Sequence, residues 1–194
     1  MPDHFKSAIR DSIKQVRAKI SVTYRFKSSN QICARIRSLE TYRQAKKIAL
    51  YCAINGEIDL ASLWDSAPLQ GKACYFPVLN EDKTLSFLPA MPNTPFKKNR
   101  YGIPEPDVSL DLAIPVQELD LIIMPLVAFD LRCTRLGMGA GYYDRTLANV
   151  KSVNLYGVGY QFQRVDFIEA KQWDVPLDAI ITQKAIYWRN VLND

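Results

Sequence analysis

The chain has 194 residues, 48% of them hydrophobic and 23% charged, with a formal net charge of +5. This length and composition predict a single globular domain, residues 1–194, that buries about 70% of the surface of its unfolded chain. No run approaches the ~20 apolar residues that a bilayer-spanning helix needs, and the first residues lack the apolar core of a secretory signal.

The histidine and cysteine content excludes several reaction classes. His4 is the single histidine and is expected at a frayed terminus, so Ser-His-Asp, Cys-His and most zinc or iron chemistry lack their imidazole. The cysteines show no C-x-x-C spacing and predict free thiols in a cytoplasmic protein. An enzyme of this composition must use carboxylates, Lys and Arg, backbone amides and a hard cation. The four cysteines are Cys33, Cys52, Cys74 and Cys133.

Positive charge is concentrated at the N-terminus. Residues 1–50 hold 12 basic and three acidic residues, whereas residues 51–194 hold 13 and 17. This asymmetry indicates an anionic partner, or else only a solvated helix surface. Residues 3–20 are predicted to be a helix, in which Lys6 and Arg10, one turn apart, can face one anion. The stripe expected to be buried is Phe5, Ile9, Ile13, Val16 and Ile20.

The following elements alternate between helix and strand. A helix is predicted over 30–46, a strand over 47–54, and a helix opening at 57–59, where Glu57 can interact with the helix dipole. Strands over 73–78 and 84–88 are expected to pair as a hairpin, and 89–106 reads as an irregular loop. The loop contains basic and aromatic side chains, which are expected either to lie over a ligand or to be merely solvent-exposed. They are Lys98, Arg100 and Tyr101.

The central stretch is a glycine-rich segment between a predicted strand and a predicted helix. Residues 121–128 form an apolar strand ending near Pro125, and 142–149 form a helix. Gly137, Gly139 and Gly141 lie between them, an arrangement that presents backbone N–H groups to a phosphate, or that is simply a tight turn. Asp144, in the first turn of the helix, could hold Mg²⁺ on a bound nucleotide.

The C-terminal part completes a three-layer, Rossmann-like α/β fold. Strands are predicted over 154–160, whose glycines allow close approach of another element, and over 179–182. Alternating helices and strands predict a mostly parallel sheet with helices on both faces. The segments after Ile54, Pro125 and Tyr160 then share one site at the carboxyl edge of the strands.

The central stretch resembles the signature of the 5-formyltetrahydrofolate cyclo-ligase family. Similar blocks occur at Lys6 and Arg10, at 51–59, at 99–106 and along the tail, so the resemblance covers nearly the whole chain. The signature positions are Pro125, Ala128, Phe129, Asp130, Arg135, Leu136, Gly137, Gly139, Gly141, Tyr142, Tyr143, Asp144 and Arg145.

The resemblance implies a function and a set of site residues. The family converts 5-formyltetrahydrofolate and MgATP to 5,10-methenyltetrahydrofolate, ADP and phosphate, which makes ATP and Mg²⁺ the expected cofactors. The expected partners are ATP and 5-formyltetrahydrofolate, the latter with or without a polyglutamate tail. We expect no nucleic acid or membrane partner. The expected oligomeric state is a monomer or weak homodimer. The implied residues are Arg135 and Asp144 for catalysis; Lys6, Arg10, Arg135, Gly137, Gly139, Ala140, Gly141, Tyr142, Tyr143 and Asp144 for ATP; Cys52, Glu57, Tyr101, Met138 and Tyr143 for the folate; and Asp144 and Asp174 for the metal.

Departures from the family pattern and other functions stay open. Many relatives have Gly at Cys133 and Gly or Lys at Ala140; an alanine fits there if its φ is negative. Asp174 can equally be a turn or cap residue. A sugar-phosphate isomerase or CoA transferase shares this architecture but consumes no ATP. A nucleotide-binding paralogue without folate turnover, and a nucleic-acid binder using the basic third, are further alternatives.

Overall fold

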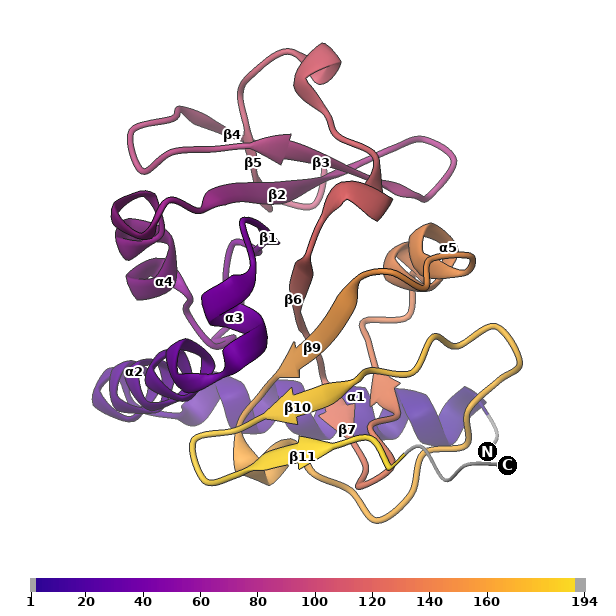
Figure 1. The fold of residues 1–194 in the computed structure, drawn as a ribbon. Coiled ribbons are helices and arrows are strands. Elements are labelled where there is room, and N and C mark those ends of the chain that lie inside the picture. Colours follow the sequence, from indigo (N-terminus) through magenta and orange to yellow (C-terminus); the bar gives the residue numbers. More distant parts are fainter. Residues whose placement is uncertain (1–2, 191–194) are drawn as a thin grey trace.

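A computed structural model, which describes residues 3–190, is organised around a seven-stranded sheet with strand order β11-β10-β9-β6-β1-β2-β3 (Figure 1). Two small hairpins, β4-β5 and β7-β8, lie outside this sheet. The elements are α1 (Asp3–Lys19), α2 (Val22–Ser38), α3 (Glu40–Gln44), β1 (Lys47–Ala49), α4 (Ala61–Ser66), η1 (Pro68–Gln70), β2 (Ala73–Leu79), β3 (Leu85–Pro89), β4 (Phe96–Lys98), β5 (Pro104–Pro106), η2 (Leu110–Leu112), η3 (Val116–Glu118), β6 (Leu121–Pro125), β7 (Ala128–Phe129), β8 (Arg135–Leu136), α5 (Tyr142–Leu147), β9 (Asn154–Val158), η4 (Gln161–Gln163), β10 (Ala179–Ile181) and β11 (Ile186–Trp188).

The inner strands of the sheet are parallel and its two edges are antiparallel. β10, β9, β6, β1 and β2 run in one direction, while β3 and β11 pair antiparallel to their neighbours. β6 is buried along almost its whole length, as its unbroken apolar sequence predicts for a central strand. The predicted mostly parallel sheet is therefore confirmed, and the segments that follow β1, β6 and β9 emerge at one edge.

Helices cover both faces of the sheet, so the predicted three-layer architecture is confirmed. Alternate residues of β6 enter different cores: Ile123 packs beneath α2, α3 and α4, whereas Ile122 packs on the face that carries α5. The second face is covered by this one short helix (Figure 1) and by irregular segments, and Val116 of η3 packs against the same core. Gly157 on β9 allows that packing, because a Cβ there would lie 2.5 Å from Leu177 Cδ1.

α1 packs beside the β7-β8 hairpin at the carboxyl edge of the sheet (Figure 1). The helix predicted over 3–20 is confirmed, and His4 lies on it rather than on a frayed end. The buried stripe was wrong in part. Phe5 and Val16 are exposed, whereas the basic residues Lys6 and Arg17 are buried together with Ile13. α1 therefore turns a partly cationic face toward the protein.

Several predicted element boundaries need correction. The helix predicted over 30–46 begins at Val22, where Ser21 accepts the Tyr24 N–H, and it breaks at Leu39 before α3. The predicted loop 89–106 contains the β4-β5 hairpin, and β11 was not predicted. The helix expected at 57–59 begins only at Ala61, so the predicted interaction of Glu57 with a helix dipole was wrong.

Candidate active site at the carboxyl edge of the sheet

The glycine loop, residues 137–141, connects β8 directly to α5. The strand immediately before it is β8 rather than β6, because the β7-β8 hairpin intervenes. Gly139 and Gly141 have φ values of 103° and 72°, in the range that residues with a Cβ rarely adopt. Glycine is therefore required at these two positions by backbone conformation, which agrees with the predicted strand-loop-helix arrangement.

An ion pair ties the two ends of this loop together. Arg135 Nη2 lies 2.6 Å from Asp144 Oδ1, and the Arg135 side chain is only 5% exposed. Arg135 also donates to the Val175 carbonyl, and the Val175 N–H donates to Asp144 Oδ1 over 3.1 Å. The two residues predicted to be catalytic are thus brought together, and they brace the loop against residues 174–176.

α1 brings its cations to the same loop. Arg10 Nε donates to the Gly137 carbonyl over 2.9 Å, across 127 residues of sequence. A Cβ at Gly139 would lie 3.4 Å from Arg10 Cζ, so the guanidinium lies against the loop backbone. Lys6, one turn earlier, is 6% exposed. The structure therefore places the predicted Arg10 at the loop and buries Lys6 on the same helix face.

The two carboxylates predicted to hold a metal have different environments. Asp144 Oδ1 is occupied by Arg135 and the Val175 N–H, whereas Asp174 Oδ2 accepts the Lys171 N–H within its own turn. Within residues 3–190, no group of three or more His, Cys, Asp and Glu side chains is arranged to hold a metal ion. These donors do not make a preformed Mg²⁺ site. At most, a carboxylate could touch an ion that arrives on a phosphate chain.

Glu57 lies on the loop after β1 and is almost sealed from solvent. Its Oε2 accepts the Ile54 N–H over 3.1 Å, and its Oε1 lies 3.7 Å from Arg17 Nη1. Burial raises the pKa of the Glu57 carboxyl, while the Ile54 N–H and the Arg17 charge lower it. Burial, and then the Glu57 charge, raise the pKa of Tyr143, so the glycine-loop helix and this carboxylate act on each other.

Cys52 and Tyr160 complete this end of the site. Burial raises the pKa of the Cys52 thiol to about 11, which keeps it protonated and unreactive at neutral pH. Tyr160, after β9, donates its hydroxyl to the Gly56 carbonyl over 3.0 Å and stacks on Tyr24 and Phe162. The loops after β1 and β9 are therefore in contact, as the predicted shared edge requires.

Sequence reasoning missed Arg17, Tyr24 and Tyr160 as site residues. Arg17 had a detectable signal, since Lys6, Arg10, Ile13 and Arg17 repeat at helical spacing along one face of α1. A stripe that alternates cations with one apolar residue is unusual for a core face. For the two tyrosines no local pattern distinguishes a site residue from an ordinary core aromatic.

The predicted loop contacts at 98–101 lie on the outer side of α5. Arg100 Nη2 donates to the Tyr142 hydroxyl over 3.2 Å and lies over the Tyr101 ring, which is 59% exposed. The Arg100 hydrogen bond lowers the pKa of Tyr142. Lys98 is exposed on β4. Of these side chains, Arg100 contacts the glycine-loop helix, through Tyr142.

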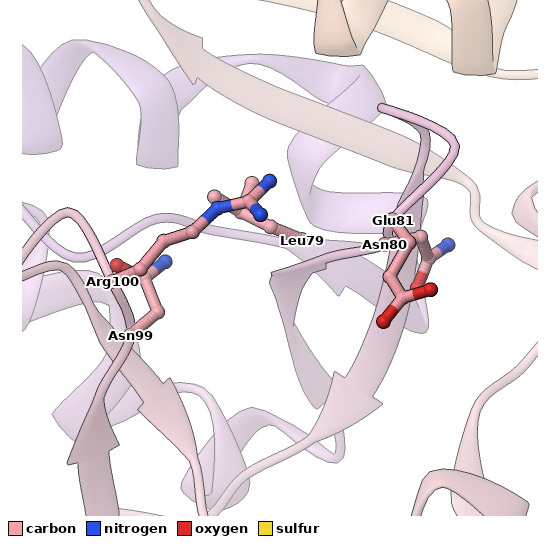
Figure 2. Close-up of a pocket in the computed structure, with 5 residues that line it drawn as sticks. All are labelled: Leu79, Asn80, Glu81, Asn99 and Arg100. Atoms are coloured by element: carbon pink, nitrogen blue, oxygen red, sulfur yellow. The ribbon is translucent and has the colours of Figure 1, made fainter.

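A shallow pocket of about 210 Å³ separates the β2-β3 hairpin from this loop (Figure 2). Figure 2 shows Arg100 on one side and Glu81 on the other. Asn80 and Asn99 also line the pocket, but their amides are hydrogen-bonded to Thr84, Ser86 and Glu105. The pocket is separate from the Arg10–Gly137 contact.

The remaining predicted positions lie on or beside the glycine loop. Met138 is 49% exposed, and Ala140 does not have a positive φ, so an alanine is unstrained there. The Ala140 carbonyl accepts a hydrogen bond from Arg145. Cys133 has a φ of 61° and is fully buried, with Sγ 3.3 Å from the Tyr187 carbonyl. A glycine at position 133 would therefore relieve backbone strain.

Comparison with known proteins decides the family. The 5-formyltetrahydrofolate cyclo-ligase family profile matches residues 3–183. The chain belongs to this family. It is 39% identical over 180 residues to the 5-formyltetrahydrofolate cyclo-ligase of Haemophilus influenzae, covering 91% of this chain and 96% of that protein. The Escherichia coli K12 cyclo-ligase is 33% identical over 179 residues, covering 90% and 98% of the two chains.

Solved structures give the same result for the cyclo-ligase fold. The NMR structure of Aquifex aeolicus 5,10-methenyltetrahydrofolate synthetase superposes with a TM-score of 0.83 at 33% identity, covering 95% of this chain and 93% of that one. The Mycoplasma pneumoniae synthetase gives a TM-score of 0.76 at 26% identity, with coverages of 92% and 98%. The family match ends before β11, so the Arg10–Gly137, Arg135–Asp144 and Arg17–Glu57 contacts all lie within it.

Proposed function

We propose that this chain converts 5-formyltetrahydrofolate and ATP to 5,10-methenyltetrahydrofolate, ADP and phosphate. The supporting observation is the contact of α1 with both halves of one site. Arg10 meets the glycine loop through Gly137, and Arg17, two turns later, meets Glu57. A triphosphate at the loop and a folate at Glu57 would then be held by the same helix, at the carboxyl edge where α/β folds bind ligands.

The reaction needs activation of a poor leaving group. The formyl oxygen attacks the γ-phosphorus of ATP, and the bond to ADP breaks, which leaves an O-phosphorylated iminium at N5. N10 then adds to that carbon and loses its proton to solvent, the C–O bond breaks, and inorganic phosphate departs. No covalent intermediate with the enzyme forms. Catalysis therefore rests on in-line positioning and charge neutralisation, which suits a site without histidine.

The glycine-loop residues are proposed to hold the triphosphate. Backbone N–H groups of residues 137–141 would bind phosphate oxygens, and Lys6 and Arg10 would neutralise their charge. Arg135 is braced by Asp144 and is proposed to keep the loop in shape for transfer. Tyr142, in the first turn of α5, would lie beside the nucleotide.

The folate is proposed to bind between the loop after β1 and α5. Glu57 would accept N–H groups of the pterin ring, and Tyr143 and Cys52 would line the pocket with Met138. A ring system of this kind also suits stacking on aromatic side chains. Tyr101 is held 59% exposed beyond Tyr142, where it would meet only an extended part of a ligand, such as a glutamate tail.

Mg²⁺ is proposed to enter on ATP, where it would neutralise phosphate charge. Asp144 is the carboxylate on the loop itself and Asp174 precedes the Val175 peptide that contacts it. Because neither forms a metal site with other side chains of residues 3–190, no step of the proposed reaction depends on a particular coordination. We further propose a cytoplasmic enzyme, in line with four free thiols, acting as a monomer or weak homodimer.

The test is the near-ultraviolet absorbance of the methenyl product, followed with 5-formyltetrahydrofolate in the presence and absence of MgATP. A rise that requires both substrates is expected. Arg10→Met should lower kcat/KM for ATP by about 10–100-fold, because a charged hydrogen-bonding group is removed from the phosphate loop. Lys14→Met is the matched control, since Lys14 lies on the same helix and, within the part of the chain that the structure describes, makes no hydrogen bond to the loop.

Each other result has a defined meaning. No absorbance rise, with ATP still protecting the protein against thermal unfolding, would indicate a nucleotide-binding relative with another substrate. Neither a rise nor protection would mean that the glycine loop is only a turn. Either outcome contradicts the proposed reaction.

A further inference from the structure

Arg17 is a buried cation without a full set of partners among residues 3–190. It lies near the end of α1, is 2% exposed, and its Nε and Nη2 are buried without a hydrogen-bond acceptor from these residues. The nearest carboxylate oxygen, Glu57 Oε1, is 3.7 Å from Nη1, beyond hydrogen-bond distance. A guanidinium in this state destabilises the fold, so its presence requires another explanation.

The backbone holds Arg17 and Glu57 in fixed relative positions. A Cβ at Gly56 would lie 3.1 Å from the Arg17 carbonyl oxygen, so α1 packs directly on the turn that precedes Glu57. The Gly56 carbonyl accepts the Tyr160 hydroxyl, which ties that turn to the loop after β9. Main-chain packing therefore fixes α1 against the turn that carries Glu57, and burial of both side chains confines their charged groups near each other.

Arg17 is the cation whose field acts on Glu57. The titratable groups that interact electrostatically with the carboxylate from the other elements are tyrosines, which are neutral at physiological pH. Burial raises the pKa of Glu57 and Arg17 lowers it. Without this charge, a carboxyl group with 8% of its side chain exposed has, among the described residues, only the Ile54 N–H to favour its ionised form. The tyrosines concerned are Tyr51, Tyr143 and Tyr160.

Recognition of a pterin depends on that ionised form. The pterin ring presents an N–H and an amino group side by side, both hydrogen-bond donors. An ionised carboxylate accepts from both, whereas a protonated one offers a donor of its own against them. We propose that Arg17 is a positioning residue for folate recognition, holding Glu57 charged and aimed at the pterin; this inference rests on the proposed function.

The experiment compares pH profiles of kcat/KM for 5-formyltetrahydrofolate at saturating MgATP. In Arg17→Met the acid limb should move upward by about 1–3 pH units, the effect of removing an opposite charge from a buried carboxyl. At the wild-type acid midpoint, kcat/KM should fall by about fivefold or more, with recovery toward wild type at alkaline pH. The KM for ATP should change less than twofold, and 5-formyltetrahydrofolate binding, followed by tryptophan fluorescence, should show the same shift.

Three variants separate charge from packing. Arg17→Lys keeps the charge and should keep the acid limb near its wild-type position. Lys14→Met removes a cation from the same helix and should leave the profile unchanged. Glu57→Gln should abolish the limb, since nothing remains to titrate. If Arg17→Met does not unfold cooperatively, Arg17→Gln is the second uncharged variant.

An acid limb at the wild-type pH in a folded Arg17→Met or Arg17→Gln protein would overturn the inference. An equal loss of kcat/KM at every pH in Arg17→Met would also overturn it. So would an acid limb shifted as far in Arg17→Lys as in Arg17→Met, because either result would indicate a purely structural role for Arg17. Failure of the wild type to form the methenyl product would instead refute the proposed function, and the inference would fall with it. The wild-type control therefore distinguishes the two failures.

Discussion

The Arg135–Asp144 ion pair provides the sharpest test of how the glycine loop is held. Asp144→Ala would leave a guanidinium that is 5% exposed with only the Val175 carbonyl as acceptor, and would also remove the acceptor of the Val175 N–H. Breaking a buried pair typically costs about 3–5 kcal/mol. Because Asp144 keeps 25% exposure, we expect about 2–4 kcal/mol of lost unfolding free energy.

A double-mutant cycle measures this coupling. Urea unfolding of Asp144→Ala, Arg135→Met and the double variant should give a coupling energy of about 1–3 kcal/mol. The exposed pair Glu40–Arg43, with side chains 64% and 61% exposed, is the matched control and should give about 0.5 kcal/mol or less. Asp144→Ala should also lower kcat by roughly 100-fold, because a displaced loop misplaces the phosphates.

Additive stability losses in the double-mutant cycle would refute the proposed role of the Arg135–Asp144 ion pair. If the two single changes sum to the double within about 0.5 kcal/mol, the ion pair does not hold the loop, whatever its distance. A stable Asp144→Ala protein without activity would instead assign Asp144 a direct role toward the substrates or their metal.

Three further predictions concern packing, strain and pH. Gly157→Ala should lower the free energy of unfolding, measured by chemical denaturation, by about 2–3 kcal/mol, because its Cβ would lie 2.5 and 2.8 Å from two leucine methyl groups. Gly71→Ala is the control: a Cβ there meets open space, so it should cost only about 1 kcal/mol. Cys133→Gly should change the free energy of unfolding by less than about 1 kcal/mol, because relief of left-handed backbone strain offsets the lost packing. Cys133→Val should lower the free energy of unfolding by about 2 kcal/mol or more. Equal losses in the two variants would contradict this prediction. In ultraviolet titration, Tyr142 should ionise below the usual tyrosine pKa, and Arg100→Ala should reverse this shift. Because folding lowers the pKa of Tyr142, the Arg100–Tyr142 interaction stabilises the fold through this ionisation only at alkaline pH, and that stabilisation disappears as the pH falls through the folded pKa. An unchanged Tyr142 titration in Arg100→Ala would contradict this prediction.

Local patterns predicted the parallel core and the backbone conformation of the glycine loop well. The unbroken apolar run of β6 indicated a central strand, and the every-second-residue glycines indicated a backbone that needs left-handed conformations, which Gly139 and Gly141 adopt. The spacing of Lys6 and Arg10 indicated one helix face. These features depend on residues close in sequence, so periodicity and conformational preference are sufficient to predict them.

Contacts between separate elements could not be predicted in this way. The pairing of Asp144 with Arg135 was not foreseen, and Glu57 was expected at a helix start but lies in a loop against α1. The predicted stripe of α1 placed Phe5 inside, yet it is 49% exposed. Hydrophobic periodicity identifies the apolar face of a helix. It does not indicate when the fold buries a neighbouring cationic face of that helix instead, as it does with α1 at the candidate site.

The sequence by itself therefore determined most of the element types, the parallel sheet, the glycine loop and the family, but not the β4-β5 hairpin or β11. Only the tertiary structure decided that Arg10 meets Gly137 across 127 residues and that Arg17 is sealed against Glu57 without a full set of partners. The physical reason is that propensities act over a few residues, whereas burial and pairing of a charge depend on which distant segments the fold brings to the carboxyl edge of its strands.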